Sequence, residues 1–344
     1  MFGLLGLLGA VMAGLLVDAL VLPGQDHSHE DTHDDAHPAA ADHTGTDATG
    51  SLLDDPGAAN DPAAGMPVSD DLPDAKDAGE TLLGDAGDNV LAGQGGDDSV
   101  SGEAGDDQLG GRGGADGISG GDGVDWLYGG DGADSLAGDG GGDNLQGGAG
   151  QDDLAGDTGN DSLSGDGGAD RLAAGEGDDS AVGGEGADSL AGEAGNDAVQ
   201  GGLGGDLLEG GAGSDTLDGN EGDDTLWGDA AMAGDATVDF LNGGAGADDV
   251  HAGAGDYANG GTGADHFTVD DIVPGDAVAQ ISDFNKDEDS LVLLYDPSHH
   301  ADPEVTVASD PGSPHATVLL DGVPVVQVMG GAGLQAGDVA LQAA

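Results

Sequence analysis

A nine-residue repeat runs without a gap from Gly84 to Trp227, and it constrains the fold of this chain more than any other feature. The first position is glycine in fifteen of the sixteen copies, and the fourth is glycine in all of them. The sixth is aspartate in every copy except the first, which has Asn89, and the eighth is Leu, Val or Ile in every copy except one, which has Ala181. Four columns that stay in phase over sixteen copies predict a stacked repeat fold, in which each copy contacts its neighbours.

Each nonapeptide divides into a turn and a short strand. The first six residues carry two to four glycines, which allow positive φ angles and close approach of backbones. The last three place one aliphatic side chain between two small or polar ones, so strand alternation sends the eighth position to one face. One such side chain per copy cannot form a core, whereas stacked copies join them into a continuous column. The pattern therefore predicts parallel stacking, with each short strand paired to the next coil.

The aspartate at the sixth position ends each turn. Stacking repeats these carboxylates at about 4.8 Å, the spacing of neighbouring strands, and such a row is unfavourable unless cations lie along it. Ca²⁺ accepts about six to eight oxygen ligands in flexible geometry, backbone carbonyls included, whereas Mg²⁺ demands a tight octahedron. Zinc prefers His or Cys, which the turn positions lack. The turns are therefore predicted to bind calcium.

The charge of the chain also calls for bound cations. Its 344 residues include 70 Asp and Glu against four Lys and Arg, which gives a formal charge of -66. Such self-repulsion opposes a compact state, and about one Ca²⁺ per repeat would add about +32 to +38. The same charge excludes nucleic acid and anionic membrane surfaces as natural partners. The chain has no cysteine, so disulfides and thiolate metal sites are excluded as well.

The repeat resembles the RTX, or haemolysin-type, calcium-binding nonapeptide G-G-x-G-x-D-x-U-x. The resemblance implies an all-β fold, a right-handed parallel β-roll in which two nonapeptides make one coil and the sixteen copies make eight. It implies core rungs at Leu91, Val100, Leu109 and every ninth residue onward. It also implies that each Ca²⁺ lies between turns two repeats apart, held by sixth-position aspartates and turn carbonyls. The implied metal ligands are Asp98, Asp107, Asp116, Asp125, Asp134, Asp143, Asp152, Asp161, Asp170, Asp179, Asp188, Asp197, Asp206, Asp215, Asp224, Asp248 and Asp265.

The repeat is less regular after Trp227. An interruption at 228–242 is predicted either to loop out of the roll or to mark a kink. The pattern returns at 243–251, continues in a shortened copy at 252–259 and ends at 260–268. Tyr257 is assigned to the sixth position of the shortened copy, so no carboxylate ligand is predicted there.

The remaining sequence divides into three further segments. Residues 1–22 are apolar apart from Asp18 and long enough to span a membrane, and a retained anchor and an atypical export signal both stay open. Residues 23–80 have the composition of an acidic, His-rich disordered linker. The β-roll is assigned to 81–268, and 269–344 is predicted to form a small C-terminal β cap.

Short apolar runs separated by turn signals predict the strands of that cap. Ile281-Ser282-Asp283-Phe284, followed by Asp289 and an apolar run, resembles the segment that follows the repeats in RTX proteins. Such proteins commonly leave the cell by type I secretion with an uncleaved C-terminal signal, so the resemblance implies that apparatus as a partner. The predicted strands are Ala277–Ile281, Leu291–Tyr295, Val305–Val307, Ala316–Leu320 and Val323–Met329.

One motif outside the repeats suggests catalysis. Residues 29–33 read H-E-x-x-H, the zinc-protease pattern, but that chemistry needs a helix within a folded catalytic domain, and these residues lie in the linker. The five histidines at 27–43 could instead chelate a metal loosely. Trp126, Tyr128 and Trp227 flank repeat strands, where they either pack against neighbours or stack on carbohydrate. No catalytic residue is predicted.

Together these features predict a secreted, non-enzymatic calcium-binding repeat protein that folds on export and has a structural or interaction role. Two alternatives remain. The repeats could be the carrier or secretion module of an enzyme, or the chain could be a surface protein anchored by residues 1–22. In either case those residues would be its only membrane contact.

Overall fold

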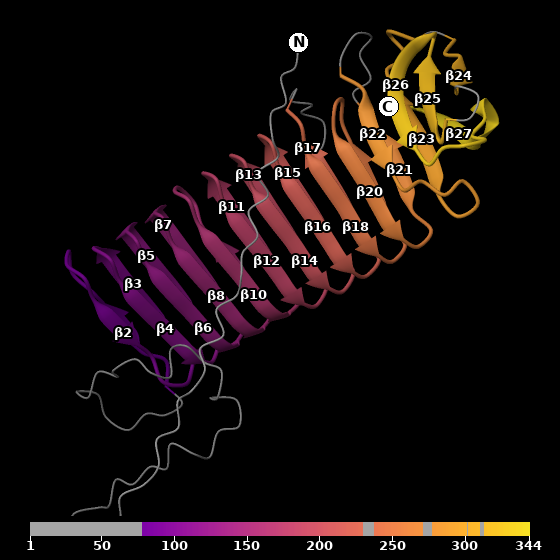
Figure 1. Cartoon of the computed structure of the whole chain (residues 1–344). Coiled ribbons are helices and arrows are strands. Elements are labelled where there is room, and N and C mark those ends of the chain that lie inside the picture. Colours follow the sequence, from indigo (N-terminus) through magenta and orange to yellow (C-terminus); the bar gives the residue numbers. More distant parts are fainter. Residues whose placement is uncertain (1–77, 230–236, 271–276, 301, 310–312) are drawn as a thin grey trace, which may run out of the picture. The chain divides into compact units, whose positions relative to one another are not determined.

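The computed structural model describes residues 78–229, 237–270, 277–300, 302–309 and 313–344, which form an all-β parallel solenoid (Figure 1). Successive strands alternate between two sheets through most of the chain. Sheet A has 13 strands: β1 (Thr81–Leu83), β3 (Ser99–Ala104), β5 (Gly117–Gly123), β7 (Ser135–Gly141), β9 (Asp153–Ala155), β11 (Arg171–Glu176), β13 (Ser189–Ala194), β15 (Leu207–Ala212), β17 (Thr225–Asp229), β19 (Asp249–Ala252), β21 (His266–Val269), β23 (Ser290–Tyr295) and β27 (Val339–Ala343). Sheet B has 14: β2 (Val90–Ala92), β4 (Gln108–Gly113), β6 (Trp126–Gly132), β8 (Asn144–Gly150), β10 (Ser162–Gly168), β12 (Ser180–Glu185), β14 (Ala198–Leu203), β16 (Thr216–Glu221), β18 (Phe240–Ala245), β20 (Tyr257–Thr262), β22 (Ala279–Ser282), β26 (Val323–Met329), β25 (His315–Leu320) and β24 (Val305–Ala308).

The nonapeptide sets the register of both sheets. Each strand begins at the seventh position of a repeat, and most run on into the first positions of the next. Parallel neighbours pair residues that lie two repeats apart, as Leu127 with Leu145 and Ile118 with Leu136. The sixteen unbroken repeats supply β2 to β17. The predicted coil of two nonapeptides is therefore confirmed, and so are the eight coils.

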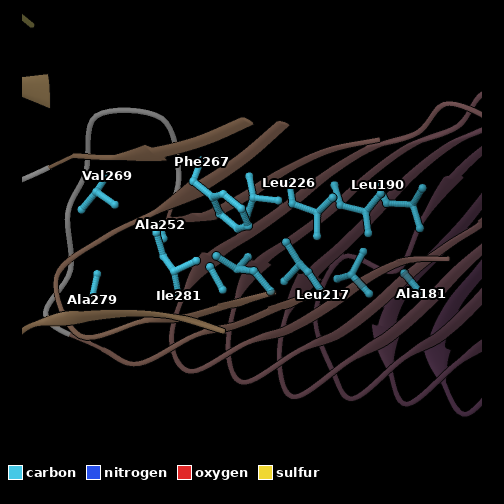
Figure 2. Close-up of a cluster of buried hydrophobic side chains, with 14 of the residues drawn as sticks. Ala181, Leu190, Leu217, Leu226, Ala252, Phe267, Val269, Ala279 and Ile281 are labelled. Carbon is cyan, nitrogen blue, oxygen red and sulfur yellow. The ribbon is translucent and has the colours of Figure 1, made fainter. Parts of the chain in front are cut away.

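The eighth-position side chains form the core between the sheets. Leu127, Leu145 and Leu163 are at most 2 % exposed. Figure 2 shows the same arrangement further along, where two rows of side chains that include Leu190 and Leu217 face each other. The predicted core column is thus confirmed, and Ala181 occupies its place in it, 1 % exposed.

The turn glycines are required by close contact between coils. Gly105, at a fourth position, has a φ of 116°, and a methyl group placed on it would lie 2.7 Å from the carbonyl carbon of Gly87 in the preceding coil. A side chain at this position would therefore be strained twice, by its backbone conformation and by the neighbouring backbone.

The interruption at 228–242 leaves the sheets in register. Residues 228 and 229 still belong to β17, and β18 pairs with β16 through Thr216 and Phe240, which are 24 residues apart instead of 18. The interruption is one more nonapeptide carrying six extra residues, and the prediction of a kink was wrong for the strands. Residues 230–236 themselves lie outside the described residues.

The assignment of Tyr257 to a sixth position was also wrong. Tyr257 pairs with Phe240, a seventh-position residue, because the shortened copy lacks one residue of its turn. Asp256 therefore ends that turn, in the place where the prediction had no carboxylate.

Both sheets continue beyond residue 268. In sheet A, β21 pairs with β23 and β23 with β27, all parallel. In sheet B, β22 pairs with β26 in parallel, and β26, β25 and β24 then form an antiparallel edge. Five predicted strands correspond to β22 to β26, whereas β27 and the one-turn 3₁₀ helix Ala336–Asp338 were not predicted.

Candidate metal centre

All seventeen predicted metal ligands are buried, with at most 4 % of each residue exposed. They separate into two columns because successive turns lie at opposite edges of the two sheets. Column 1 follows strands of sheet B and precedes strands of sheet A, as Asp116 does between β4 and β5. Column 2 connects the sheets in the other direction, as Asp107 does between β3 and β4. Column 1 contains Asp98, Asp116, Asp134, Asp152, Asp170, Asp188, Asp206, Asp224, Asp248 and Asp265, and column 2 contains Asp107, Asp125, Asp143, Asp161, Asp179, Asp197 and Asp215.

One oxygen of each carboxylate is held by the preceding coil. The backbone N–H of Asp116 donates to Oδ1 of Asp134 at 2.8 Å, and that of Asp125 donates to Oδ1 of Asp143 at 2.8 Å. The same bond, 2.7–3.1 Å long, reaches Oδ1 of every predicted ligand. These bonds fix the orientation of the carboxylates along both columns.

The other oxygen lacks a protein partner in fifteen of the seventeen. These Oδ2 atoms are buried and accept no hydrogen bond within the described part of the chain. An unsatisfied buried carboxylate oxygen is costly, so a long series of them requires an explanation. The fifteen are Asp98, Asp107, Asp116, Asp125, Asp134, Asp143, Asp152, Asp161, Asp170, Asp179, Asp188, Asp197, Asp206, Asp224 and Asp248.

Fourteen of these oxygens face the first-position glycine of their own repeat, and the repeat of Asp179 has Ala174 at that position. A methyl group placed on Gly129 would lie 2.5 Å from Oδ2 of Asp134 and 2.5 Å from the carbonyl oxygen of Gly147, one coil further on. The equivalent point beside Gly192 lies 2.5 Å from Oδ2 of Asp197 and 2.5 Å from the carbonyl oxygen of Gly210. Carboxylate and carbonyl oxygens therefore converge on the space that a glycine leaves open.

Burial without a counterion makes these groups weak acids. Loss of solvation raises the pKa of Asp134 and Asp143 to about 7, and charged carboxylates in neighbouring coils add to the rise, while the backbone N–H that each accepts opposes it. The same causes, burial first, raise the pKa to about 6 for Asp116, Asp161, Asp170, Asp197, Asp206 and Asp248. At neutral pH the empty columns would therefore store electrostatic repulsion that a cation could relieve.

The donor set suits a hard cation. It consists of carboxylate and backbone carbonyl oxygens, which are the usual ligands of Ca²⁺. Within the described ranges no three His, Cys, Asp or Glu side chains meet around one point, so carbonyl oxygens would have to complete any coordination sphere. Ca²⁺ uses such mixed sets, whereas Zn²⁺ favours nitrogen and sulfur.

Both columns end on aspartates that the sequence analysis missed. Asp256 in column 2 accepts the N–H of Asp239 at Oδ1 and that of Gly253 at Oδ2. Asp289 in column 1 accepts the N–H of Asp265 at Oδ1 and that of Asn285 at Oδ2. Backbone donors thus satisfy both oxygens of each, as expected for closed ends of the columns.

Asp239 also belongs to column 2 and was missed. It is fully buried, and its Oδ1 accepts the N–H of Asp215. The signal was present, because 228–242 is nine plus six residues long and ends in V-D-F-L-N, which matches the second half of a repeat. At the other end Asn89 accepts the N–H of Asp85 at Oδ1, so an uncharged residue begins this column.

The other candidate groups lie away from the columns. Trp227 stacks on His251 with ring centroids 3.6 Å apart, so it packs against a neighbour, whereas Trp126 is 47 % exposed. The H-E-x-x-H motif and the other histidines at 27–43 lie outside the described residues, as do residues 23–77 of the predicted linker. The described residues contain no helix long and apolar enough to cross a membrane, and residues 1–22 are not among them.

Comparison with known families gives one finding. A family model described as the RTX calcium-binding nonapeptide repeat matches residues 75–258, more than half of the chain. The match consists of eight adjoining or overlapping segments, at 75–109, 83–118, 110–145, 146–181, 164–199, 174–208, 200–231 and 232–258. No match was found among curated proteins.

Proposed function

The chain belongs to the RTX calcium-binding nonapeptide repeat family. On that premise we propose that it is an extracellular protein that binds Ca²⁺ and folds when the ions bind. In this proposal the ions occupy the two columns, between coils, and the aspartates of columns 1 and 2 are the carboxylate ligands. The role is structural or interactive, and no residue is assigned to catalysis.

One observation carries the proposal: fifteen buried Oδ2 atoms lack a protein partner, and fourteen of them are aimed at the space beside a first-position glycine. A fold that depended on protein contacts alone would not orient these carboxylates with one backbone bond each and leave the second oxygen unsatisfied. A cation in that space would supply the missing interaction and neutralise the row.

The proposal links calcium to location. Sites built from turns of this kind bind with affinities of about 10⁻⁴ to 10⁻³ M, as in extracellular modules, so they would be empty in the cytosol and occupied outside the cell. Because the site does not exist in the unfolded chain, the free energy of binding contributes directly to folding. A chain that stays unfolded inside the cell suits export through a channel. The export route proposed for it is type I secretion.

A calcium titration of the full chain tests this function. We expect the far-ultraviolet circular dichroism to change from coil to β structure as Ca²⁺ rises from zero to 10 mM, an assay choice, and Mg²⁺ at the same concentrations to have little effect. A chain that is β-rich in chelator at pH 8, or still coil at 10 mM Ca²⁺, would contradict the proposal.

Matched variants locate the ions. Asp134→Asn and Asp152→Asn each remove one negative charge from column 1 and should lower the number of Ca²⁺ bound, as measured by calorimetry. Asp131→Asn removes the same charge from an exposed turn position and should leave that number unchanged. Equal effects of all three would show that binding follows net charge rather than the columns.

A further inference from the structure

The outer face of sheet B differs in chemistry from the rest of this acidic protein. We call the seventh- and ninth-position side chains of β4 to β22 the sheet B face. These two rows contain seven Asn or Gln and four aromatic residues, with Asp218 as their one acid. The same rows of sheet A, from β3 to β23, contain no Asn or Gln, one Trp and three acids. Amides and aromatic side chains are thus concentrated on one face.

The first aromatic cluster lies on neighbouring strands. Phe240 on β18 and Tyr257 on β20 stack with ring centroids 5.0 Å apart and ring planes 8° apart, yet they remain 51 % and 40 % exposed. Asn242 and Asn259 follow them by two residues and therefore point to the same face. An open hollow of about 410 Å³ lies along these side chains and is lined also by residues of β16 and β22.

Hydrogen bonds hold the polar side chains of this hollow in place. Asn242 Nδ2 donates to Oδ1 of Asp218 at 2.7 Å, and Asn259 Oδ1 accepts the N–H of Gly261 at 3.1 Å. An amide offers both a donor and an acceptor, and each of these bonds uses only one of the two. The hollow therefore presents oriented amide groups beside exposed aromatic rings, which lowers the entropic cost of binding a partner.

A second aromatic cluster lies further along the same face. Trp126 and Tyr128 project from β6, and Asn144 and Gln146 lie beside them on β8. Six strand steps separate β6 from β18 in sheet B, which is about 29 Å at the usual strand spacing. Two clusters of the same composition at that separation suit an extended ligand rather than a small molecule.

We propose that the sheet B face binds an extended, uncharged polysaccharide. Sugar hydroxyls match the donors and acceptors of amides, and the apolar C–H surface of a pyranose ring packs against aromatic side chains. The net charge of -66 repels polyanions, whereas the sheet B face has few charges of its own to desolvate. This binding is additional to Ca²⁺ binding, and it rests on the proposed function only because the face exists in the folded roll.

The test uses the full chain in 10 mM Ca²⁺ and measures affinity by calorimetry and by retardation in native gels. The probes are hydroxyethyl cellulose, laminarin, galactomannan and dextran, with alginate as the polyanion. We expect at least one uncharged probe to bind and alginate not to bind. Phe240→Ser combined with Tyr257→Ser should weaken binding about tenfold or more, the loss expected when residues that anchor an interface are truncated.

Two further variants give the result its specificity. Leu207→Ser removes an equally exposed seventh-position side chain from sheet A and should leave the affinity unchanged. Trp126→Ser should weaken binding of the long polymer but not of its short oligosaccharides, which cannot reach both clusters. Serine already occupies the seventh position at Ser162 and Ser180, so these substitutions should not disturb the core.

Circular dichroism of the same samples separates this proposal from the proposed function, because it shows whether the roll is folded. A folded roll that binds none of the uncharged probes would overturn the proposal. So would equal losses in the sheet A and sheet B variants, or alginate binding that the double variant abolishes. Self-association that the double variant abolishes would identify a second copy of the chain as the occupant and also overturn it.

Discussion

Acid should partly replace calcium in folding this chain. Without bound ions, the folded state holds carboxyls whose pKa is raised to about 7 in Asp134 and Asp143 and to about 6 in six other aspartates. In the unfolded chain the same groups titrate near 3.8. The folded state therefore binds protons more tightly, and the stability it gains from them is complete below about pH 4 and is lost as the pH rises through 6 to 7.

The size of this effect follows from the two pKa values. Between pH 8 and pH 5 the ion-free fold should gain about 3 kcal/mol from each of Asp134 and Asp143, and about 1 kcal/mol from each aspartate whose pKa is about 6. Eight independent groups would give a total on the order of 10 kcal/mol, comparable with the whole stability of an ordinary domain. A chain that is unfolded in chelator at pH 8 should therefore gain β structure by pH 5.

Circular dichroism in chelator between pH 8 and pH 5, at low protein concentration because the isoelectric point is near 4.1, measures this gain. The double variant Asp134→Asn, Asp143→Asn keeps the Oδ1 acceptors without the charges, so it should fold at a higher pH than the parent chain. Asp122→Asn, at the exposed third position of the preceding repeat, should not shift the transition. Identical spectra at pH 8 and pH 5 would refute the reasoning, because the buried carboxyls would then not limit the ion-free fold.

Three other changes test separate parts of the structure. Gly129→Ala places a methyl group between Asp134 Oδ2 and the carbonyl oxygen of Gly147 and should weaken calcium binding in calorimetry, whereas Gly140→Ala, whose methyl group would meet no atom closer than 3.5 Å, should not. Equal effects of the two variants would mean that calcium does not bind in the space beside Gly129. Leu154→Ala in the buried core should lower the unfolding free energy of the calcium-bound protein by about 2–5 kcal/mol in denaturant titrations, while Leu207→Ala at an exposed position should change it by about 0.5 kcal/mol or less. Similar losses of stability in the two variants would argue against a single continuous core. Asp256→Ala should lower the unfolding free energy by about 1–3 kcal/mol without lowering the number of Ca²⁺ bound, because backbone N–H groups already satisfy both carboxylate oxygens. A lower number of bound Ca²⁺ would show that the calcium sites of column 2 extend to Asp256.

The repeat by itself determined the period, the core and the candidate ligands. A nonapeptide with one aliphatic position has a single way to bury it, which is to stack with its copies. The resemblance to the RTX repeat added that a coil contains two copies, which pairs Leu127 with Leu145 without any coordinates. The sixth-position aspartates followed from the same phase. These predictions depended on local pattern and on interactions between identical neighbours, and both can be read directly from a sequence.

The tertiary structure decided what happens where the copies differ. Asp239 and Asp256 belong to column 2 because strand pairing restores the register after six extra residues and after one missing residue, and pairing is a non-local interaction. Only the coordinates show that Oδ1 of each predicted ligand is held by the preceding coil, while Oδ2 faces the first-position glycine in nearly every repeat. They also show that Phe240 and Tyr257, seventeen residues apart in sequence, stack on one face. The period fixes which residues are equivalent, but the contacts between coils fix what each equivalent residue can bind.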